Sequence, residues 1–309
     1  MQEALECVEA SFVAQGSHRA INRARERIVL PPFSMHYMAA ALPDARHAGI
    51  KIYTVVHHEY RFLGLLFDSV TGRLLCLMQA DHLGRIRTGA ASGIATKYLA
   101  RPHASRVAVI GTGRQARTQL AAIARVRKLT AVKAFSRDRD RLRIYCEEMS
   151  NLLAVPVEPA ANADEAVAFA DIICTATTAQ QPVVHGEHLR PGAHINATGA
   201  NTPDHRELDD ETIQRTALIV VDSLEQSRKE SGDLIQGLQN LAQDWSEIIE
   251  LHSIVTEKNK GRVNADQITL FKSSGIALWD VAVAGCVYQK ALRLGKGKQL
   301  DIDDVQYGG

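Results

Sequence analysis

The turn at residues 111–116 has residue types and spacing that bind phosphate groups. It reads Gly111-Thr112-Gly113-Arg114-Gln115-Ala116, follows the apolar segment 107–110 and precedes a helical pattern. In such a turn the first glycine permits a sharp bend, the second lets a pyrophosphate approach the backbone, and the small last residue lets the helix pack closely. The N–H groups at the start of that helix then face the phosphates. The spacing therefore predicts a nicotinamide dinucleotide site at this turn.

The end of the next strand-like segment, residues 131–135, indicates which dinucleotide binds. NAD-preferring sites usually carry Asp or Glu at the tip of this strand, about 20 residues beyond the glycines. Here the tip reads Phe135-Ser136-Arg137, and Asp138 lies one position further. The Ser136 hydroxyl can donate to a 2′-phosphate and the Arg137 guanidinium can pair with it. The sequence favours NADP(H) over NAD(H); the alternative is that Arg137 only begins the next helix in solvent.

Five short segments form a series: residues 87–92 (RTGAAS), 111–116 (GTGRQA), 195–200 (INATGA), 230–234 (ESGDL) and 268–275 (ITLFKSSG). In this order they resemble the ornithine cyclodeaminase/mu-crystallin family, and the resemblance covers nearly the whole chain. It implies hydride transfer at an amino acid α-carbon in a homodimer. Family chains usually begin with a strand ahead of the first helix. This chain begins inside that helix, so we expect a missing strand or a misassigned start codon.

The resemblance also implies a grip on the α-carboxylate of a substrate. The family uses two Arg and one Lys, which match Arg25, Lys51 and Arg87. Arginine supplies a bidentate fork and lysine a point charge, and both suit a carboxylate. Arg23 and Arg27 lie near enough to exchange roles with Arg25, and surface charge is the alternative for that residue.

Two positions depart from ornithine cyclodeaminase itself. Asn201 stands where that enzyme has its acid–base Asp, and His36 stands where it has a Glu that faces the substrate's amines. Because Asn cannot exchange a proton near neutral pH, cyclodeamination is disfavoured. Hydride transfer to an imine needs a fixed carboxylate, a protonated imine and a close nicotinamide. His36 can supply the proton, bind a second carboxylate or only line the pocket.

These residues predict an NAD(P)H-dependent reductase of a ketimine or cyclic imino acid, or the reverse amino acid dehydrogenase. The reacting centre would contain Lys51, Arg87, His36 and Asn201. The alternatives are ornithine cyclodeaminase-type ammonia elimination and a non-enzymatic NADPH-binding protein like mu-crystallin. A carboxylate grip speaks against pure cofactor binding, because it implies a substrate.

The resemblance implies further cofactor contacts outside the glycine turn, most of them just after strand-like segments. Asp222 among them is either a substitute acid or a helix cap. These contacts are Thr88, Thr175, Ala176, Asn196, Gly199, Asp222, Ser223, Lys272 and Ser273.

An amphipathic helix and a mainly antiparallel sheet are predicted for the first hundred residues. The sheet segments are 49–56, 63–68 and 74–79, with a turn at Thr71-Gly72, and a helical pattern follows at 86–98. The first helix covers residues 2–15, and its apolar face consists of Leu5, Val8, Phe12 and Val13.

From residue 105 onward strands alternate with helices, which is typical of a doubly wound parallel sheet. The last helix, near 275–293, should rejoin the first region. We therefore predict an α/β fold in which a Rossmann-type domain, residues 101–275, is inserted into a discontinuous α+β substrate and dimerisation domain, residues 1–100 plus 276–309. Strands are expected at 105–110, 131–135, 155–157, 172–175, 194–197 and 218–221, and helices at 115–127, 139–150 and 163–169.

The composition limits the remaining function classes. The chain has 309 residues and a formal net charge of +1, which argues against nucleic acid or an anionic membrane as a partner. No apolar run is long enough to span a membrane. The five cysteines include no C-x-x-C pair. We therefore expect reduced thiols in a cytoplasmic protein, and no metal site.

Overall fold

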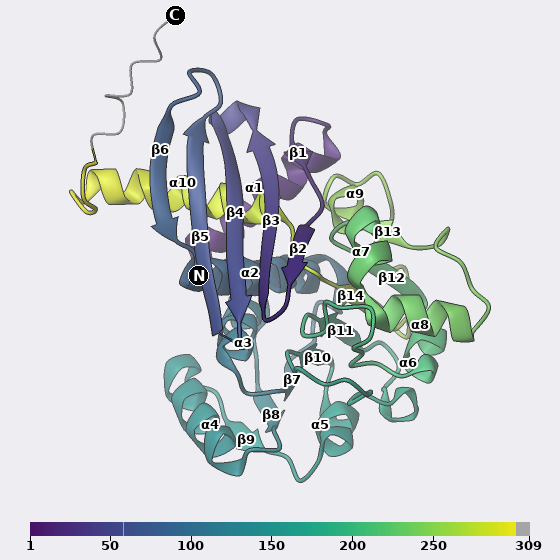
Figure 1. Cartoon of the computed structure of the whole chain (residues 1–309). Helices are drawn as coiled ribbons and strands as arrows, with labels where there is room; N and C mark the ends of the chain where they lie inside the picture. The colour runs from purple at the N-terminus through teal and green to yellow at the C-terminus, as the bar shows by residue number, and fades with distance from the viewer. Residues whose placement is uncertain (58, 301–309) are drawn as a thin grey trace, which may run out of the picture.

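The computed structural model describes residues 1–57 and 59–300, which form two separate sheets (Figure 1). The first sheet is antiparallel, with the strand order β1-β3-β4-β5-β6, and β2 pairs with β3. Its strands are β1 (Ile21–Asn22), β2 (Glu26–Leu30), β3 (Phe33–Leu42), β4 (His47–Val56), β5 (Glu59–Asp68) and β6 (Leu74–Gln79).

Three helices cover one face of the antiparallel sheet: α1 (Gln2–Gly16), α2 (Asp81–Leu99) and α10 (Ala277–Arg293). Phe12, Ile94 and Trp279 of these helices share one apolar core with Met38 and Leu66 of the strands. The last helix therefore does rejoin the first region, as predicted.

Val13 corrects one detail of the predicted first helix. It is 37% exposed, whereas Leu5, Val8 and Phe12 are buried. At 100° per residue Val13 is turned well away from Phe12, so it lies at the edge of the apolar stripe rather than within it.

The second sheet is parallel and doubly wound. β7 has β8 and β9 on one side, and β10, β11, β14, β12 and β13 on the other. Ligands bind such sheets beyond the carboxyl ends of the strands where the order reverses, here between β7 and β10. The strands are β7 (Arg106–Ile110), β8 (Ala131–Phe135), β9 (Val157–Pro159), β10 (Ile172–Thr175), β11 (His194–Ala197), β12 (Leu218–Val221), β13 (Ile249–Glu250) and β14 (Thr269–Lys272).

Helices flank both faces of the parallel sheet, which confirms the predicted fold class (Figure 1). The chain passes between the two sheets at residues 100–105 and 273–276, next to the predicted domain boundaries. The helices are α3 (Arg114–Val126), α4 (Arg139–Leu153), α5 (Ala163–Phe169), α6 (Asp210–Arg215), α7 (Leu224–Glu230), α8 (Gly232–Asn240) and α9 (Leu251–Val255).

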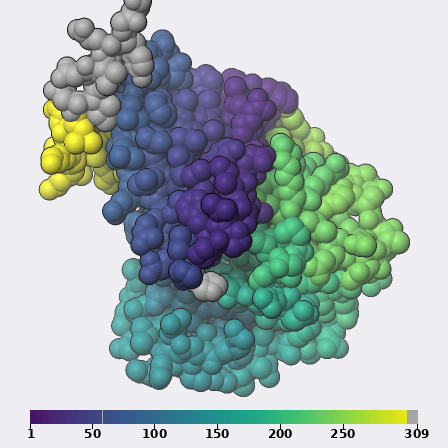
Figure 2. Space-filling model, viewed as in Figure 1, coloured from purple at the N-terminus to yellow at the C-terminus, as the bar shows by residue number. Residues whose placement is uncertain are grey.

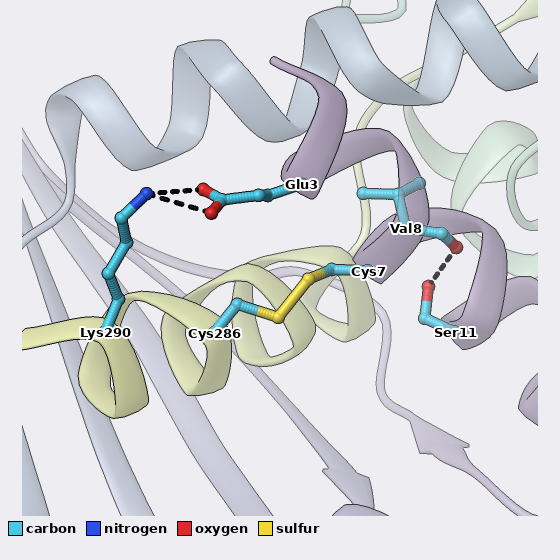
Figure 3. The surroundings of a disulfide bond; sticks show 6 residues. All are labelled: Glu3, Cys7, Val8, Ser11, Cys286 and Lys290. Atoms are coloured by element: carbon cyan, nitrogen blue, oxygen red, sulfur yellow. Dashed lines mark hydrogen bonds and ion pairs between the residues drawn. A yellow bond between two sulfur atoms is a disulfide. The ribbon is translucent and has the colours of Figure 1, made fainter. Parts of the chain in front are cut away.

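A disulfide joins Cys7 of α1 to Cys286 of α10 (Figure 3). The Glu3–Lys290 ion pair, at 2.8 Å, links the same two helices beside it. The expectation that all five thiols are reduced was therefore wrong for this pair. Local spacing rules cannot detect a bond between cysteines 279 positions apart, which only the packing of α1 on α10 brings together. Cys76, Cys146 and Cys174 are free thiols.

Within residues 1–57 and 59–300, no helix has both the length and the hydropathy needed to cross a membrane. The same residues contain no cluster of three His, Cys, Asp or Glu side chains able to hold a metal ion.

Candidate active site

A cavity of about 160 Å³ lies where the antiparallel sheet meets the glycine turn. In Figure 2 the purple and blue residues of that sheet lie directly against the teal and green residues of the parallel sheet. Side chains from β4, β5 and α2 form one wall, and residues from the ends of the parallel strands form the other. Arg25, Lys51 and Arg87, which we predicted to hold a carboxylate, all line this cavity.

Lys51 and Arg87 share one carboxylate oxygen. Lys51 lies on the helix-covered side of β4, and Arg87 lies on α2. The Lys51 Nζ is 3.0 Å and the Arg87 Nε is 3.1 Å from Oδ1 of Asp280, on α10. Arg87 uses only its Nε in hydrogen bonds to the described residues. Its two Nη groups thus remain available for a bidentate contact with a substrate carboxylate.

The Lys51 ammonium group is an unusually strong acid for a lysine. Burial, with the Arg87 charge beside it, lowers its pKa to about 8, and the Asp280 carboxylate opposes that shift. Burial disfavours the charged amine because it removes hydration. Below pH 8 Lys51 is a cation that can also release a proton.

Arg25 is held by the opposite side of the cavity. It precedes β2 and forms a buried ion pair with Glu230 at the end of α7. Its Nη2 also donates to the backbone oxygen of Ser274 at 2.9 Å. Glu230 also pairs with Arg27 at 2.7 Å, so this one carboxylate is shared by two arginines.

The turn after β14 is shaped around Arg87. Gly275 has φ +80°, and a side chain there would overlap the Arg87 guanidinium. Asp222 fixes this turn, because its Oδ2 accepts from the Gly275 N–H at 2.6 Å and from the Ser273 hydroxyl at 2.8 Å. Ser273 lines the cavity, but Asp222 is fully buried behind it. Asp222 is therefore neither a cavity acid nor a helix cap.

His36 does not line the cavity. Its ring stacks on Tyr53 with centroids 4.4 Å apart, and its Nδ1 accepts from Arg27 Nε at 3.2 Å. Burial and the charges of Arg27 and Arg25 lower its pKa to about 4, so the ring is neutral at neutral pH. Asn201, in contrast, does line the cavity, and its backbone oxygen accepts from Arg27.

The glycine turn fits a dinucleotide. Gly111 has φ +93°, and a Cβ there would lie 2.7 Å from the Ala176 backbone oxygen. A Cβ on Gly113 would meet no heavy atom within 4 Å, so open space lies over the start of α3. No side chain caps that helix. Its N–H groups are thus free to face a pyrophosphate. Gln115 and Thr88 connect this region to the cavity, since both line it.

At the ribose end, Asp138 caps α4 and accepts from the Arg141 N–H at 3.0 Å. The Asp138 carboxylate is therefore engaged away from a ribose. Ser136 is half-buried and Arg137 is exposed. Among the described residues, Arg137 makes no hydrogen bond or ion pair.

Several residues predicted as cofactor contacts lie inside the protein. Asn196 donates to the Thr96 hydroxyl at 2.9 Å, and Ser223 caps α7. Lys272, fully buried, pairs with Asp233 at 2.8 Å. None of Asn196, Ser223 and Lys272 lines the cavity, and all three are buried.

Glu207 is a buried residue that the sequence did not single out. Its carboxylate accepts from the Thr175 hydroxyl at 2.7 Å, the Thr177 N–H at 2.8 Å and the Gly199 N–H at 2.8 Å. It therefore connects the carboxyl ends of β10 and β11. Thr175 is buried in these contacts, whereas Ala176 and Gly199 remain partly exposed at the same edge.

Three comparisons identify similar proteins. The family model described as "Ornithine cyclodeaminase/mu-crystallin family" matches residues 1–295. A Delta(1)-pyrroline-2-carboxylate reductase of Bacillus cereus is 32% identical over 98% of this chain and 96% of its own length. The ketimine reductase mu-crystallin of Mus musculus is 35% identical over 72% of this chain and 67% of its own length. The structure of Thermococcus litoralis Delta(1)-pyrroline-2-carboxylate reductase, in complex with NADH and L-proline, has a TM-score of 0.93 and 37% identity over 97% of this chain and 96% of that one.

Proposed function

The chain belongs to the ornithine cyclodeaminase/mu-crystallin family, and on this premise we propose that it is an NAD(P)H-dependent reductase of a cyclic imino acid with one carboxylate. The observation that carries the proposal is the convergence of Arg25, Lys51 and Arg87 on one small cavity next to Gln115 of the glycine turn. Relatives named as pyrroline-2-carboxylate and ketimine reductases support reduction of a C=N bond.

The substrate carboxylate would be held by the Nη groups of Arg87 and the amine of Lys51, which we call the carboxylate clamp. The bidentate contact fixes the plane of the carboxylate and thereby the position of the α-carbon. The nicotinamide, when bound, supplies a hydride to that carbon. Burial of both cations excludes water from the contact and strengthens it.

The imine nitrogen needs a proton as the α-carbon is reduced. Lys51 lines the cavity, and its pKa of about 8 leaves it protonated at neutral pH with a proton to give. A group whose pKa lies near the working pH is suited to general acid catalysis. His36, our earlier candidate, is neutral and lies behind Tyr53. Asn201 can hydrogen-bond the nitrogen but cannot act as the acid that cyclodeamination requires.

The aromatic residues of the cavity wall favour a substrate with one carboxylate and an apolar ring. Lys51 and Arg87 are opposed by Asp280, and Arg25 shares Glu230 with Arg27. Beside Lys51, whose Nζ lies 5.5 Å from the centre of the Phe62 ring, Tyr53, Tyr60 and Phe62 form an aromatic wall. A second carboxylate held against these rings would lose hydration, at a desolvation cost.

NADPH is the proposed cofactor, in preference to NADH. Arg137 is exposed and unpaired within the described chain, and Asp138 is engaged as the cap of α4. An unpaired arginine beside Ser136 suits a 2′-phosphate, and an occupied acid gives the ribose of NADH no partner.

We also propose a homodimer that forms through the open face of the antiparallel sheet. Ile52 pairs with Tyr37 on one side and with Leu63 on the other, so the three share that face. Tyr37 is 37% and Leu63 45% exposed, whereas the opposite face is covered by helices. A contiguous exposed apolar surface of this kind marks an interaction site.

The proposal is tested by incubating the protein with NADPH or NADH and a panel of imines while following nicotinamide absorbance. The panel contains Δ1-pyrroline-2-carboxylate, Δ1-piperideine-2-carboxylate, and pyruvate or oxaloacetate with ammonia. We expect the cyclic monocarboxylates to react with a kcat/KM at least about tenfold above that of the oxaloacetate mixture, since a second buried carboxylate costs more than 1 kcal/mol.

Two results would contradict the proposal. Faster reduction of the oxaloacetate mixture would refute the single-carboxylate assignment. Tight NADPH binding without turnover of any imine would refute the reductase assignment. Ornithine with NAD⁺ is the control for cyclodeamination, and we expect no ammonia release.

A further inference from the structure

Asp280 is the one acid in α10, and it contacts no expected position of substrate or cofactor. Its side chain is 6% exposed and lies against the two cations of the clamp. Its Oδ1 is shared by Lys51 Nζ and Arg87 Nε. Its Oδ2 is buried and has no hydrogen-bond partner among the described residues. Among the described residues, Lys51 and Arg87 are thus the hydrogen-bond partners of this carboxylate.

We propose that Asp280 is a positioning residue, which holds Lys51 and Arg87 at one oxygen so that they present the amine and the Nη groups to the same substrate carboxylate. This inference rests on the proposed function and adds a residue that does not touch the substrate. A single acceptor atom lies 3.0 Å from one cation and 3.1 Å from the other, which keeps the two cations close together. Two like charges would otherwise repel each other in a buried site.

The same carboxylate sets the acidity of Lys51. Arg87 from α2 and Arg25 from the segment before β2 lower the Lys51 pKa, and Asp280 from α10 raises it. Without the Asp280 charge, the pKa of Lys51 would fall below about 8, and the amine would lose its proton near neutral pH. The other titratable or charged groups on the cavity wall are Tyr53, Tyr60, Asp81 and Arg85.

The test uses D280N, which removes the charge and keeps the shape. Because Asp280 Oδ2 has no donor next to it, an amide NH₂ at that position creates no clash between donors. The wild-type kcat/KM should fall above about pH 8, as Lys51 loses its proton. In D280N this fall in kcat/KM should begin about one pH unit or more lower, and the affinity for NADPH should be unchanged. D280E, which keeps the charge, should reverse part of this shift. An equal loss of activity at every pH would refute the inference.

A second measurement does not depend on turnover. A lysine whose folded pKa is depressed binds fewer protons in the folded than in the unfolded state, so stability is lost as pH falls through the folded pKa. The D280N protein should therefore show a larger melting-temperature deficit at about pH 6 than at about pH 9.5, where Lys51 is neutral in both proteins. Equal deficits would refute the inference even if imines are reduced. An inactive wild type with unequal deficits would refute the proposed function alone.

The control is E3Q. It removes the exposed ion pair between Glu3 and Lys290, which also involves α10 but lies away from the clamp. We expect it to leave the pH profile of kcat/KM unchanged and to alter the melting temperature equally at both pH values.

Discussion

Arg137 is exposed at the end of β8, and its guanidinium is the group we assign to a 2′-phosphate. Replacing it with alanine should raise the KM for NADPH about tenfold or more, because the variant loses a hydrogen bond to a charged phosphate. The KM for NADH should stay nearly unchanged. Steady-state kinetics with each cofactor measures this. R143A is the control, because Arg143 is also an exposed arginine of α4 but does not pair with Asp138 in the described structure. An equal effect of R137A on both cofactors would contradict the assignment.

Among single residues, the sequence could predict the charged side chains that match the family's carboxylate-binding positions. Arg25, Lys51 and Arg87 converge although they are far apart in the chain. The sequence did not predict the roles of Asp280 and Glu207, because the partners of these buried acids lie on other helices and strands. Nothing in the neighbouring sequence of Asp280 indicates that it faces Lys51 and Arg87. The spacing from Arg25 could not indicate that the His36 ring stacks on Tyr53, because this contact depends on the pairing of β3 with β4.

At the scale of elements, the turn between β14 and α10 is fitted to Arg87. G275A should lower kcat/KM about tenfold or more, because alanine at φ +80° is strained by about 1–2 kcal/mol and its Cβ would displace the guanidinium. G72A is the matched control: Gly72 has φ +74°, and no atom lies within 4 Å of its Cβ position. Both variants carry the strain of alanine at positive φ; G275A should lose at least as much stability in thermal unfolding as G72A, and only G275A should lose activity. A comparable loss of activity in G72A would refute the role of the turn.

The elements themselves were predictable where local signals agree. β8, β10, β11, β12 and α5 have the bounds that the pattern predicted, since short apolar runs and helical spacing define them. The pattern assigned no strand to β3, whose alanines at 39–41 have low strand propensity and are held in the sheet by β4. It also missed β14, which pairs with β11 on one side and β12 on the other.

At the scale of the whole molecule, the open sheet face should determine the oligomeric state. L63K should convert a wild-type dimer to a monomer, because Leu63 is near the centre of that face and a lysine there would be desolvated on association. Light scattering coupled to size-exclusion chromatography measures the mass. V70K is the control, since Val70 is 71% exposed but lies in the turn beyond the sheet. A wild type that elutes as a monomer, or an L63K dimer, would contradict the proposal.

The disulfide between α1 and α10 has a consequence for cleavage of the chain. Cys7 and Cys286 enclose nearly all of the sequence in one covalent ring. A protease that cuts one exposed loop anywhere between them would leave a nicked protein whose pieces stay joined. Those pieces would separate on a denaturing gel only after a thiol reductant opens the ring.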